Sequence, residues 1–286
     1  MTKNEAPPIL SHKHYSASSA FTPESLLREA RRQKSLAAAD MPDVCILDPD
    51  GDIVRHLRAT GRAARHPEWA CYHTELDLFR HEGEEYGIVG CAVGAPFAVL
   101  VAEELFASGC RLLISVTSAG QILPIKAPPY FIVIDRARRD EGTSYHYLPP
   151  SDYSDADAAL TKLAGAALAA SSTSILSGST WTTDAPFRET QEAIDAAAQA
   201  GILAVEMEAA ALYAFSKARG AAVLCIAHVT NQMGRVDGDF EKGLADGAEE
   251  SLKVIYLIAD RWRSEVGRKI KAAERATRPL MHDDTV

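Results

Sequence analysis

Two glutamates stand on either side of Met207, where an apolar strand-like segment meets an apolar helix-like one. A carboxylate at a helix N-terminus is stabilised by about 0.3–1 kcal/mol, which accounts for Glu208, the first residue of "EAAALYAFSKARG". That reason does not extend to Glu206, near the end of "ILAVEM", because a buried carboxylate costs several kcal/mol unless it is hydrogen-bonded. Two carboxylates that converge at a strand end suit a polyhydroxy ligand, whose hydroxyl groups are hydrogen-bond donors.

Two glycine- and hydroxyl-rich segments follow other strand-like runs. "GCAVGAPFA" places Gly94 before a helix, where backbone amides and the helix N-terminus favour an anion, although a tight turn gives the same pattern. Its spacing matches neither the dinucleotide fingerprint nor the Walker loop. "SVTSAGQ" places Thr117 and Ser118 at the exit of a strand, where they could hold a phosphate or a sugar or simply form a polar turn.

The segment "TTDAPFRET" combines an aromatic with an arginine. Phe187 could stack on a planar base, and Arg188 could donate paired hydrogen bonds to carbonyl oxygens. The alternative is a helix start, with Asp184 as the N-cap and Pro186 near the first turn. The two interpretations are compatible with each other.

Strand-like and helix-like segments alternate along the chain. Strands are expected at 43–47, 86–90, 110–116, 130–135, 172–183, 202–207 and 221–231, and helices at 21–36, 97–109, 155–171, 189–201, 208–220 and 240–266. The first helix has Thr22 as its expected N-cap. Strands that are apolar on both faces indicate an α/β fold with a mostly parallel sheet covered by helices on both sides. Ligands of such sheets bind beyond the carboxyl ends of the strands.

Composition narrows the class of protein. The chain has 286 residues, 47% of them hydrophobic, and a formal net charge of −9, which argues against broad nucleic-acid binding. No apolar run is long enough to span a membrane, and the N-terminus lacks the apolar region of a secretory signal, so we expect a cytoplasmic protein. We expect an arm at 1–20, one domain at 21–270 and a charged tail at 271–286.

The cysteines and histidines do not indicate a metal site. The sequence has five cysteines, an odd number, with no CxxC spacing, which is typical of reduced thiols. His12 and His14 lie in the polar arm, and no histidine pair sits at ligand spacing near a cysteine. We therefore expect neither a bound metal nor an organic cofactor.

The segment "VEMEAAALYAFSKARG" resembles the signature of the nucleoside phosphorylase superfamily, especially its uridine phosphorylase branch. Further segments resemble that family in its order: "VGCAVGAPFAVLVAEEL", "LLISVTSAGQI", "RRDEGTSYHY", "TTDAPFRET" and "HVTNQM". The resemblance spans roughly residues 43 to 260. It implies a three-layer phosphorylase/hydrolase-like fold with a mixed, mostly parallel central sheet. It also implies attack of inorganic phosphate, the co-substrate, on a nucleoside to release the base and a (deoxy)ribose 1-phosphate.

Carried over to this sequence, the resemblance gives each site residue an expected role. Glu208 would accept hydrogen bonds from the ribose 2′- and 3′-hydroxyls and stabilise the positive charge of the transition state, and Met207 would pack against the sugar. Glu206 matches the base-proximal glutamate.

The remaining roles concern the base, the phosphate and a neighbouring subunit. Phe187 and Arg188 would contact the base, and Ser118 matches a phosphate-binding hydroxyl of the family. Thr117 and Gly94, in the hydroxyl and glycine loops, are expected to bind substrate as well. His12 or His14 would reach the ribose site of a neighbouring subunit, as an N-terminal histidine does in the family. A homo-oligomer is expected by analogy, since relatives form dimers or hexamers.

The sequence departs from the family at the phosphate end. Leu47 replaces a glycine before Asp48-Pro49, and the arginine expected after them is absent, with Arg55 displaced. Ser115 stands where a second arginine is expected. Other arginines are available as substitutes but do not match the motif, namely Arg138 and Arg139.

These departures leave three functions open. The first is a nucleoside phosphorylase, the second a phosphate-independent nucleosidase, and the third a non-catalytic nucleoside-binding member. Asn231 occupies the region where purine-specific relatives carry an aspartate, and an asparagine cannot act as a general acid at neutral pH. A pyrimidine, uridine-like substrate is therefore favoured.

Overall fold

A computed structural model describes residues 7–169, 171–233 and 237–277. Within them ten strands form one sheet, in the order β10-β6-β8-β9-β5-β1-β4-β3-β2, with β7 paired to β6. The strands are β1 (Val44–Asp48), β2 (Ala63–Arg65), β3 (Asp77–His81), β4 (Glu84–Gly90), β5 (Leu112–Gln121), β6 (Tyr130–Asp140), β7 (Tyr153–Asp155), β8 (Ile175–Thr183), β9 (Ala204–Glu206) and β10 (Val223–Asn231). The mixed α/β sheet confirms the predicted fold class.

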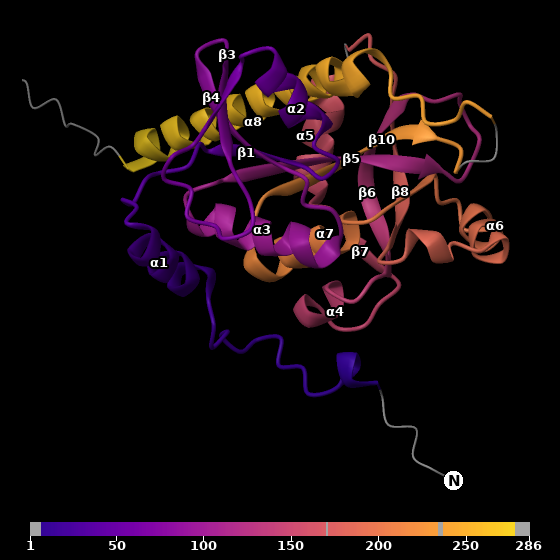
Figure 1. Ribbon diagram of the computed structural model, residues 1–286, viewed down its shortest axis with the longest axis horizontal. Helices are drawn as coiled ribbons and strands as arrows, with labels where there is room; N and C mark the ends of the chain where they lie inside the picture. Colours follow the sequence, from indigo (N-terminus) through magenta and orange to yellow (C-terminus); the bar gives the residue numbers. More distant parts are fainter. Residues whose placement is uncertain (1–6, 170, 234–236, 278–286) are drawn as a thin grey trace, which may run out of the picture.

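Helices cover both faces of this sheet (Figure 1). They are α1 (Pro23–Lys34), α2 (Asp52–Ala59), α3 (Ala95–Ala107), α4 (Ser144–Tyr147), α5 (Ala158–Leu168), α6 (Gln191–Gln199), α7 (Ala209–Arg219) and α8 (Ala248–Thr277), with short 3₁₀ helices η1 (Pro8–Leu10), η2 (Pro186–Arg188) and η3 (Leu244–Gly247). Of the two largest core clusters, α2, α5 and α8 bury one against the sheet, and α3 and α7 bury the other. None of the described helices is both long and apolar enough to cross a membrane.

The direction of the strands brings the site segments together. Strands β4, β1, β5 and β10 run parallel, so their carboxyl ends lie at one edge of the sheet. Strand β10 pairs with both β5 and β6, and the path β5-β9-β8-β6 closes a ring of pairings. Strand β9 is antiparallel to β5, with Val205 opposite Gly120, and parallel to β8, with Glu206 opposite Thr182. The turn from β9 into α7 therefore lies beside the carboxyl-terminal half of β5.

Several predicted elements need correction. Strand β5 continues to Gln121, so "TSAG" is strand and not an exit loop, because it pairs with both β9 and β10. Helix α8 begins at Ala248 rather than near residue 240. Thr190, not Asp184, is the N-cap of α6, and it accepts a hydrogen bond from the Ala193 amide. The predicted Thr22 cap of α1 is confirmed.

The two ends of the chain differ. The arm extends away from the body, and it is held where Lys13 Nζ lies 2.8 Å from His146 Nδ1 and Tyr15 donates to the Tyr145 carbonyl at 3.3 Å (Figure 1). Helix α8 continues past residue 271, the predicted start of the tail, to Thr277. Residues 1–6 of the predicted arm and 278–286 of the predicted tail lie outside the described residues.

Candidate nucleoside site

The side chain of Glu206, at the end of β9, caps α7 by accepting hydrogen bonds from the first backbone amides of that helix. Its side chain is 3% exposed. Oε2 accepts hydrogen bonds from the Glu208 and Ala209 amides, both at 2.7 Å. Oε1 accepts from the hydroxyls of Thr180 at 3.0 Å and Thr182 at 2.5 Å. Burial raises the pKa of Glu206 and these hydrogen bonds oppose the rise. The protein itself therefore satisfies both oxygens of this carboxylate.

Thr182 extends the cap by one residue. Its hydroxyl oxygen accepts a hydrogen bond from the Ala210 amide at 2.9 Å. The first amides of a helix have no partners within the helix, so β8 and β9 together satisfy the start of α7. This arrangement fixes the backbone of Glu208 at the N-cap position and leaves its side chain free of any capping bond.

Glu208 is a buried acid whose carboxylate has a hydrogen-bond partner on only one of its two oxygens among the described residues. It is 1% exposed, and Oε1 accepts a hydrogen bond from the Gly94 amide at 2.7 Å. Oε2 has no hydrogen-bond partner among the described residues. Burial, and then the charge of Glu206, raises the pKa of Glu208 to about 8, and the Gly94 amide, followed by the nearby Thr117 hydroxyl, opposes the rise. A buried acceptor without a donor is costly, which indicates a position that a ligand hydroxyl completes.

Gly94, which donates to the Glu208 carboxylate, has a positive φ and leaves open space where a side chain would lie. Its φ is +91°, and a Cβ placed there would meet no atom within 4 Å. It is also the N-cap of α3, so the helix starts at the Glu208 carboxylate. The structure thus brings together three of the predicted residues, Gly94, Thr117 and Glu208, from β4–α3, β5 and β9–α7.

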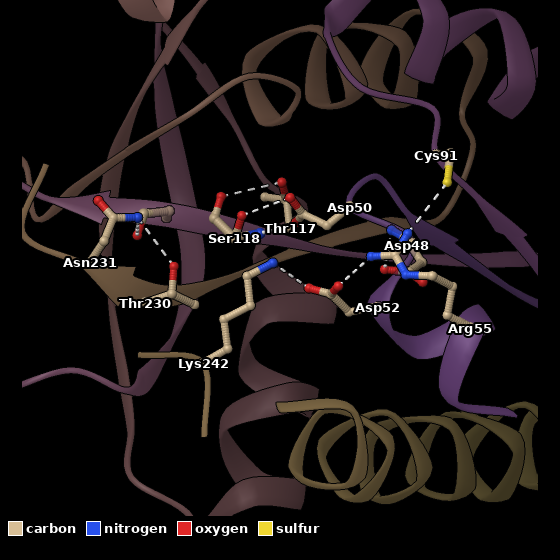
Figure 2. Close-up of polar contacts among 12 residues, drawn as sticks. Asp48, Asp50, Asp52, Arg55, Cys91, Thr117, Ser118, Thr230, Asn231 and Lys242 are labelled. Atoms are coloured by element: carbon tan, nitrogen blue, oxygen red, sulfur yellow. Dashed lines mark hydrogen bonds and ion pairs between the residues drawn. The ribbon is translucent and has the colours of Figure 1, made fainter. Parts of the chain in front are cut away.

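The amide and the hydroxyl of Ser118 already donate hydrogen bonds to a carboxylate of the protein. Its amide donates to Asp50 Oδ2 at 2.6 Å and its hydroxyl donates to Asp50 Oδ1 at 2.8 Å (Figure 2). Asp50 lies in the turn between β1 and α2. No pattern in the sequence of this turn indicates that one of its acids reaches β5.

Two neighbouring acids frame Asp50. Asp48 accepts from the Gly51 amide at 3.1 Å and the Val54 amide at 2.9 Å, and burial raises its pKa to about 7. Asp52 binds Arg55 Nη2 at 2.5 Å and also pairs with Lys242 (Figure 2). These acids, with Thr117, Ser118 and His228 among others, line a cavity of about 10 Å³. That volume admits about one water molecule and not a phosphate.

The other candidate phosphate arginines do not reach this cavity. Arg139 is buried and donates to four neutral acceptors at 2.7–3.2 Å, on Ser144, Leu148, Pro149 and Ser151. Its guanidinium therefore holds the 144–151 loop together. Arg138 lies on β6, in register with Tyr153 and Trp181. Ser115 is buried in the middle of β5.

No hydrogen bond among the described residues joins the predicted base-contacting residues Phe187 and Arg188 to Glu208. Phe187 and Arg188 lie on η2 and are exposed, Phe187 at 99%. Met207 is partly buried between the two glutamates. His14 and His12 are exposed on the arm.

The side chain of Asn231 makes hydrogen bonds to its own sequence neighbours at the end of β10. Its Oδ1 accepts from the Met233 amide at 2.9 Å, and its Nδ2 donates to Thr230 Oγ1 at 3.2 Å. It lies opposite Gly120 of β5.

Comparison with known proteins places this geometry in a family. A family profile described as the phosphorylase superfamily matches residues 43–260. A guanosine phosphorylase of Halorubrum lacusprofundi is 30% identical over 59% of this chain and 67% of its own length. A uridine phosphorylase of Thermococcus kodakarensis is 26% identical over 81% of this chain and 90% of its own length.

A solved structure shares the fold. The crystal structure of uridine phosphorylase from Vibrio fischeri superposes with a TM-score of 0.65 at 22% identity, covering 79% of this chain and 97% of that one. Because the profile match runs from β1 into α8 and takes in every segment that meets at Glu208, the chain belongs to the phosphorylase superfamily.

Proposed function

We propose that this protein cleaves the N-glycosidic bond of a nucleoside by phosphorolysis, giving the free base and a (deoxy)ribose 1-phosphate. The observation that carries the proposal is Glu208 Oε2, a buried carboxylate oxygen with no partner among the described residues, held beside Gly94 and Thr117. Vicinal ribose hydroxyls are donors of the number and kind that this oxygen lacks.

The charge of Glu208 is matched to the reaction. As the bond from C1′ to the base breaks, positive charge develops on the ribose ring, and a carboxylate fixed in a buried site stabilises that charge. The Glu206–Thr182 cap fixes the backbone of Glu208, and the Gly94 amide holds its carboxylate, so both are in place before substrate arrives. In this proposal Glu206 positions Glu208 and does not bind the base, and Met207 packs against the sugar.

For the base we favour a pyrimidine such as uracil. Asn231 cannot donate a proton as a general acid, and a uracil leaving group carries its negative charge on exocyclic oxygens that hydrogen bonds can stabilise. The named relatives include a uridine phosphorylase and a guanosine phosphorylase, so both classes of nucleoside belong in the assay.

Hydrolysis is the second candidate, and one observation favours it. Asp50 holds both donors of Ser118, and the cavity beside it has room for about one water molecule. With water as the acceptor, the products would be the base and free ribose.

One assay separates these functions. The protein is incubated with uridine, thymidine, inosine and guanosine, with and without inorganic phosphate, and base release is followed by chromatography. Phosphate-dependent release supports phosphorolysis, and equal release without phosphate supports hydrolysis. Binding of nucleoside without base release contradicts both and identifies a non-catalytic binding protein.

Phe187→Ala tests the proposed base contact. Because the ring is 99% exposed, its removal should change the melting temperature by less than about 1 °C. If the ring stacks on the bound base, KM for the nucleoside should rise by up to about tenfold, the equivalent of 0.5–1.5 kcal/mol of aromatic contact. Phe240→Ala, at another exposed phenylalanine, is the control and should leave KM unchanged. An unchanged KM in Phe187→Ala would remove this residue from the site.

A further inference from the structure

Asp50 binds Ser118 in the manner of an external anion. Its two oxygens take the amide and the hydroxyl of the same residue, at 2.6 and 2.8 Å. Two oxygens of a phosphate would use the same pair of donors. The donors lie on β5, one residue beyond Thr117, whose hydroxyl lies beside the Glu208 carboxylate.

The geometry points to Asp50 as the residue that selects the acceptor of the glycosyl group. We propose that its carboxylate competes with inorganic phosphate for the amide and hydroxyl of Ser118, so that phosphate binds only when Asp50 swings away. This inference rests on the proposed function and assigns to Asp50 the phosphate affinity of that site.

The space beside Ser118 supports competition rather than joint binding. Asp50 holds both donors of Ser118, and the space left beside it is only about 10 Å³, so a phosphate reaches these donors only by displacing the carboxylate. Asp50 is partly exposed and lies in a turn, so its side chain can rotate towards solvent without unfolding an element. Gly51, with φ at +77°, supplies the left-handed residue that this turn requires.

The surrounding charges point the same way. Within the described residues no lysine or arginine forms an ion pair with Asp50, whereas Arg55 and Lys242 both pair with Asp52. A phosphate dianion that arrives beside Asp50 therefore meets a like charge, and the two described cations nearby, Arg55 and Lys242, are already paired with Asp52. Removing the Asp50 carboxylate frees two donors and removes one negative charge from the same position.

The test is direct titration of inorganic phosphate by calorimetry into the wild-type protein, Asp50→Ala and Asp50→Asn. We expect Asp50→Ala to lower the Kd for phosphate at least tenfold. Asp50→Asn retains the size of the side chain and can keep one hydrogen bond to Ser118, so its Kd should fall by a smaller factor. Adding Ser118→Ala to Asp50→Ala should raise the Kd again, because one of the freed donors is lost.

Asp246→Asn is the matched control. Asp246 lines the same cavity, and its substitution removes one negative charge, as the Asp50 substitutions do. The Ser118 amide and hydroxyl bond to Asp50 and not to Asp246. Its φ is +53°, a conformation that asparagine also tolerates. Its Kd for phosphate should stay within twofold of the wild-type value. The inference is overturned if Asp50→Ala also stays within twofold, or if Asp246→Asn lowers the Kd as much as Asp50→Ala does.

Calorimetry with phosphate alone needs no turnover, so the two proposals can fail separately. Tighter phosphate binding by Asp50→Ala without cleavage of any nucleoside would support the role of Asp50 and contradict the proposed function. Phosphate-dependent cleavage by the wild-type protein, with an unchanged Kd in Asp50→Ala, would support the function and overturn the role of Asp50.

Discussion

Glu208→Gln is expected to lower kcat/KM for nucleoside cleavage by about 10- to 100-fold while it stabilises the fold. The substitution keeps the shape of the side chain and removes its charge. Hydrogen bonds to a charged acceptor contribute about 1.5–3 kcal/mol, and their weakening accounts for the loss of activity. The gain in stability follows from burial, since a carboxylate that is 1% exposed and half-satisfied is replaced by a neutral amide.

The gain in stability should depend on pH. Burial raises the pKa of Glu208 to about 8, from an ordinary value of 4.5. Between these values the folded protein holds a proton that the unfolded chain has lost, so the stability of the wild-type protein falls as pH rises. Glu208→Gln has no such proton. Its free energy of unfolding should therefore exceed that of the wild type by a margin that grows from pH 5 to pH 8.

The same ionisation of Glu208 should affect activity in the opposite direction, so that activity rises with pH where stability falls. The ionised carboxylate is the better acceptor for ribose hydroxyls, so kcat/KM of the wild-type protein should rise with pH through about 8. Glu208→Gln should lose this rising limb. Urea denaturation and initial rates across pH 5–9 measure the two effects.

Glu104→Gln is the control for burial alone. Glu104 is also 1% exposed, burial raises its pKa, and it lies within α3, away from the start of that helix at Gly94. It should gain stability as Glu208→Gln does and keep kcat/KM within twofold. If Glu208→Gln also keeps kcat/KM within twofold, Glu208 does not bind the ribose.

The sequence was sufficient to predict the strand, the acid and the helix around Glu208, because the local sequence patterns there agree with the fold. An apolar strand, an acid and an alanine-rich helix followed one another without a gap, and Gly94 preceded a helix of its own. The meeting of these two helix starts follows from parallel strands that end at one edge. The local sequence pattern and the topology of the sheet thus favour the same structure for these residues.

The sequence was insufficient where a contact joins distant segments. The pairing of Asp50 with Ser118 spans 68 residues, and neither residue carries a local mark of the other. The extension of β5 to Gln121 likewise depends on strands β9 and β10, which come much later in the chain. Thr190 outcompeted Asp184 as the cap of α6 because Asp184 accepts instead from the Gly142 amide, again a distant partner.

Glu206→Ala is expected to lower the free energy of unfolding by about 3–5 kcal/mol. The carboxylate satisfies the amides of Glu208 and Ala209, and each buried donor left without a partner costs about 1–3 kcal/mol. The cavity left by the side chain adds to this cost. The alanine variant no longer bears the desolvation cost of a buried carboxylate, so the expected loss is smaller than the sum of these terms. Urea denaturation at pH 7 measures the change.

Glu206→Gln separates the cap from the charge. The glutamine oxygen can accept from the two α7 amides, while its NH₂ group faces the Thr180 and Thr182 hydroxyls, which can rotate to accept. The loss should then be about 1–2 kcal/mol, since the capping bonds persist without charge. Because the cap positions Glu208, kcat should fall in Glu206→Gln with little change in nucleoside KM. A loss of less than 1 kcal/mol in Glu206→Ala would contradict the capping role and return Glu206 to the candidates for direct contact with the base.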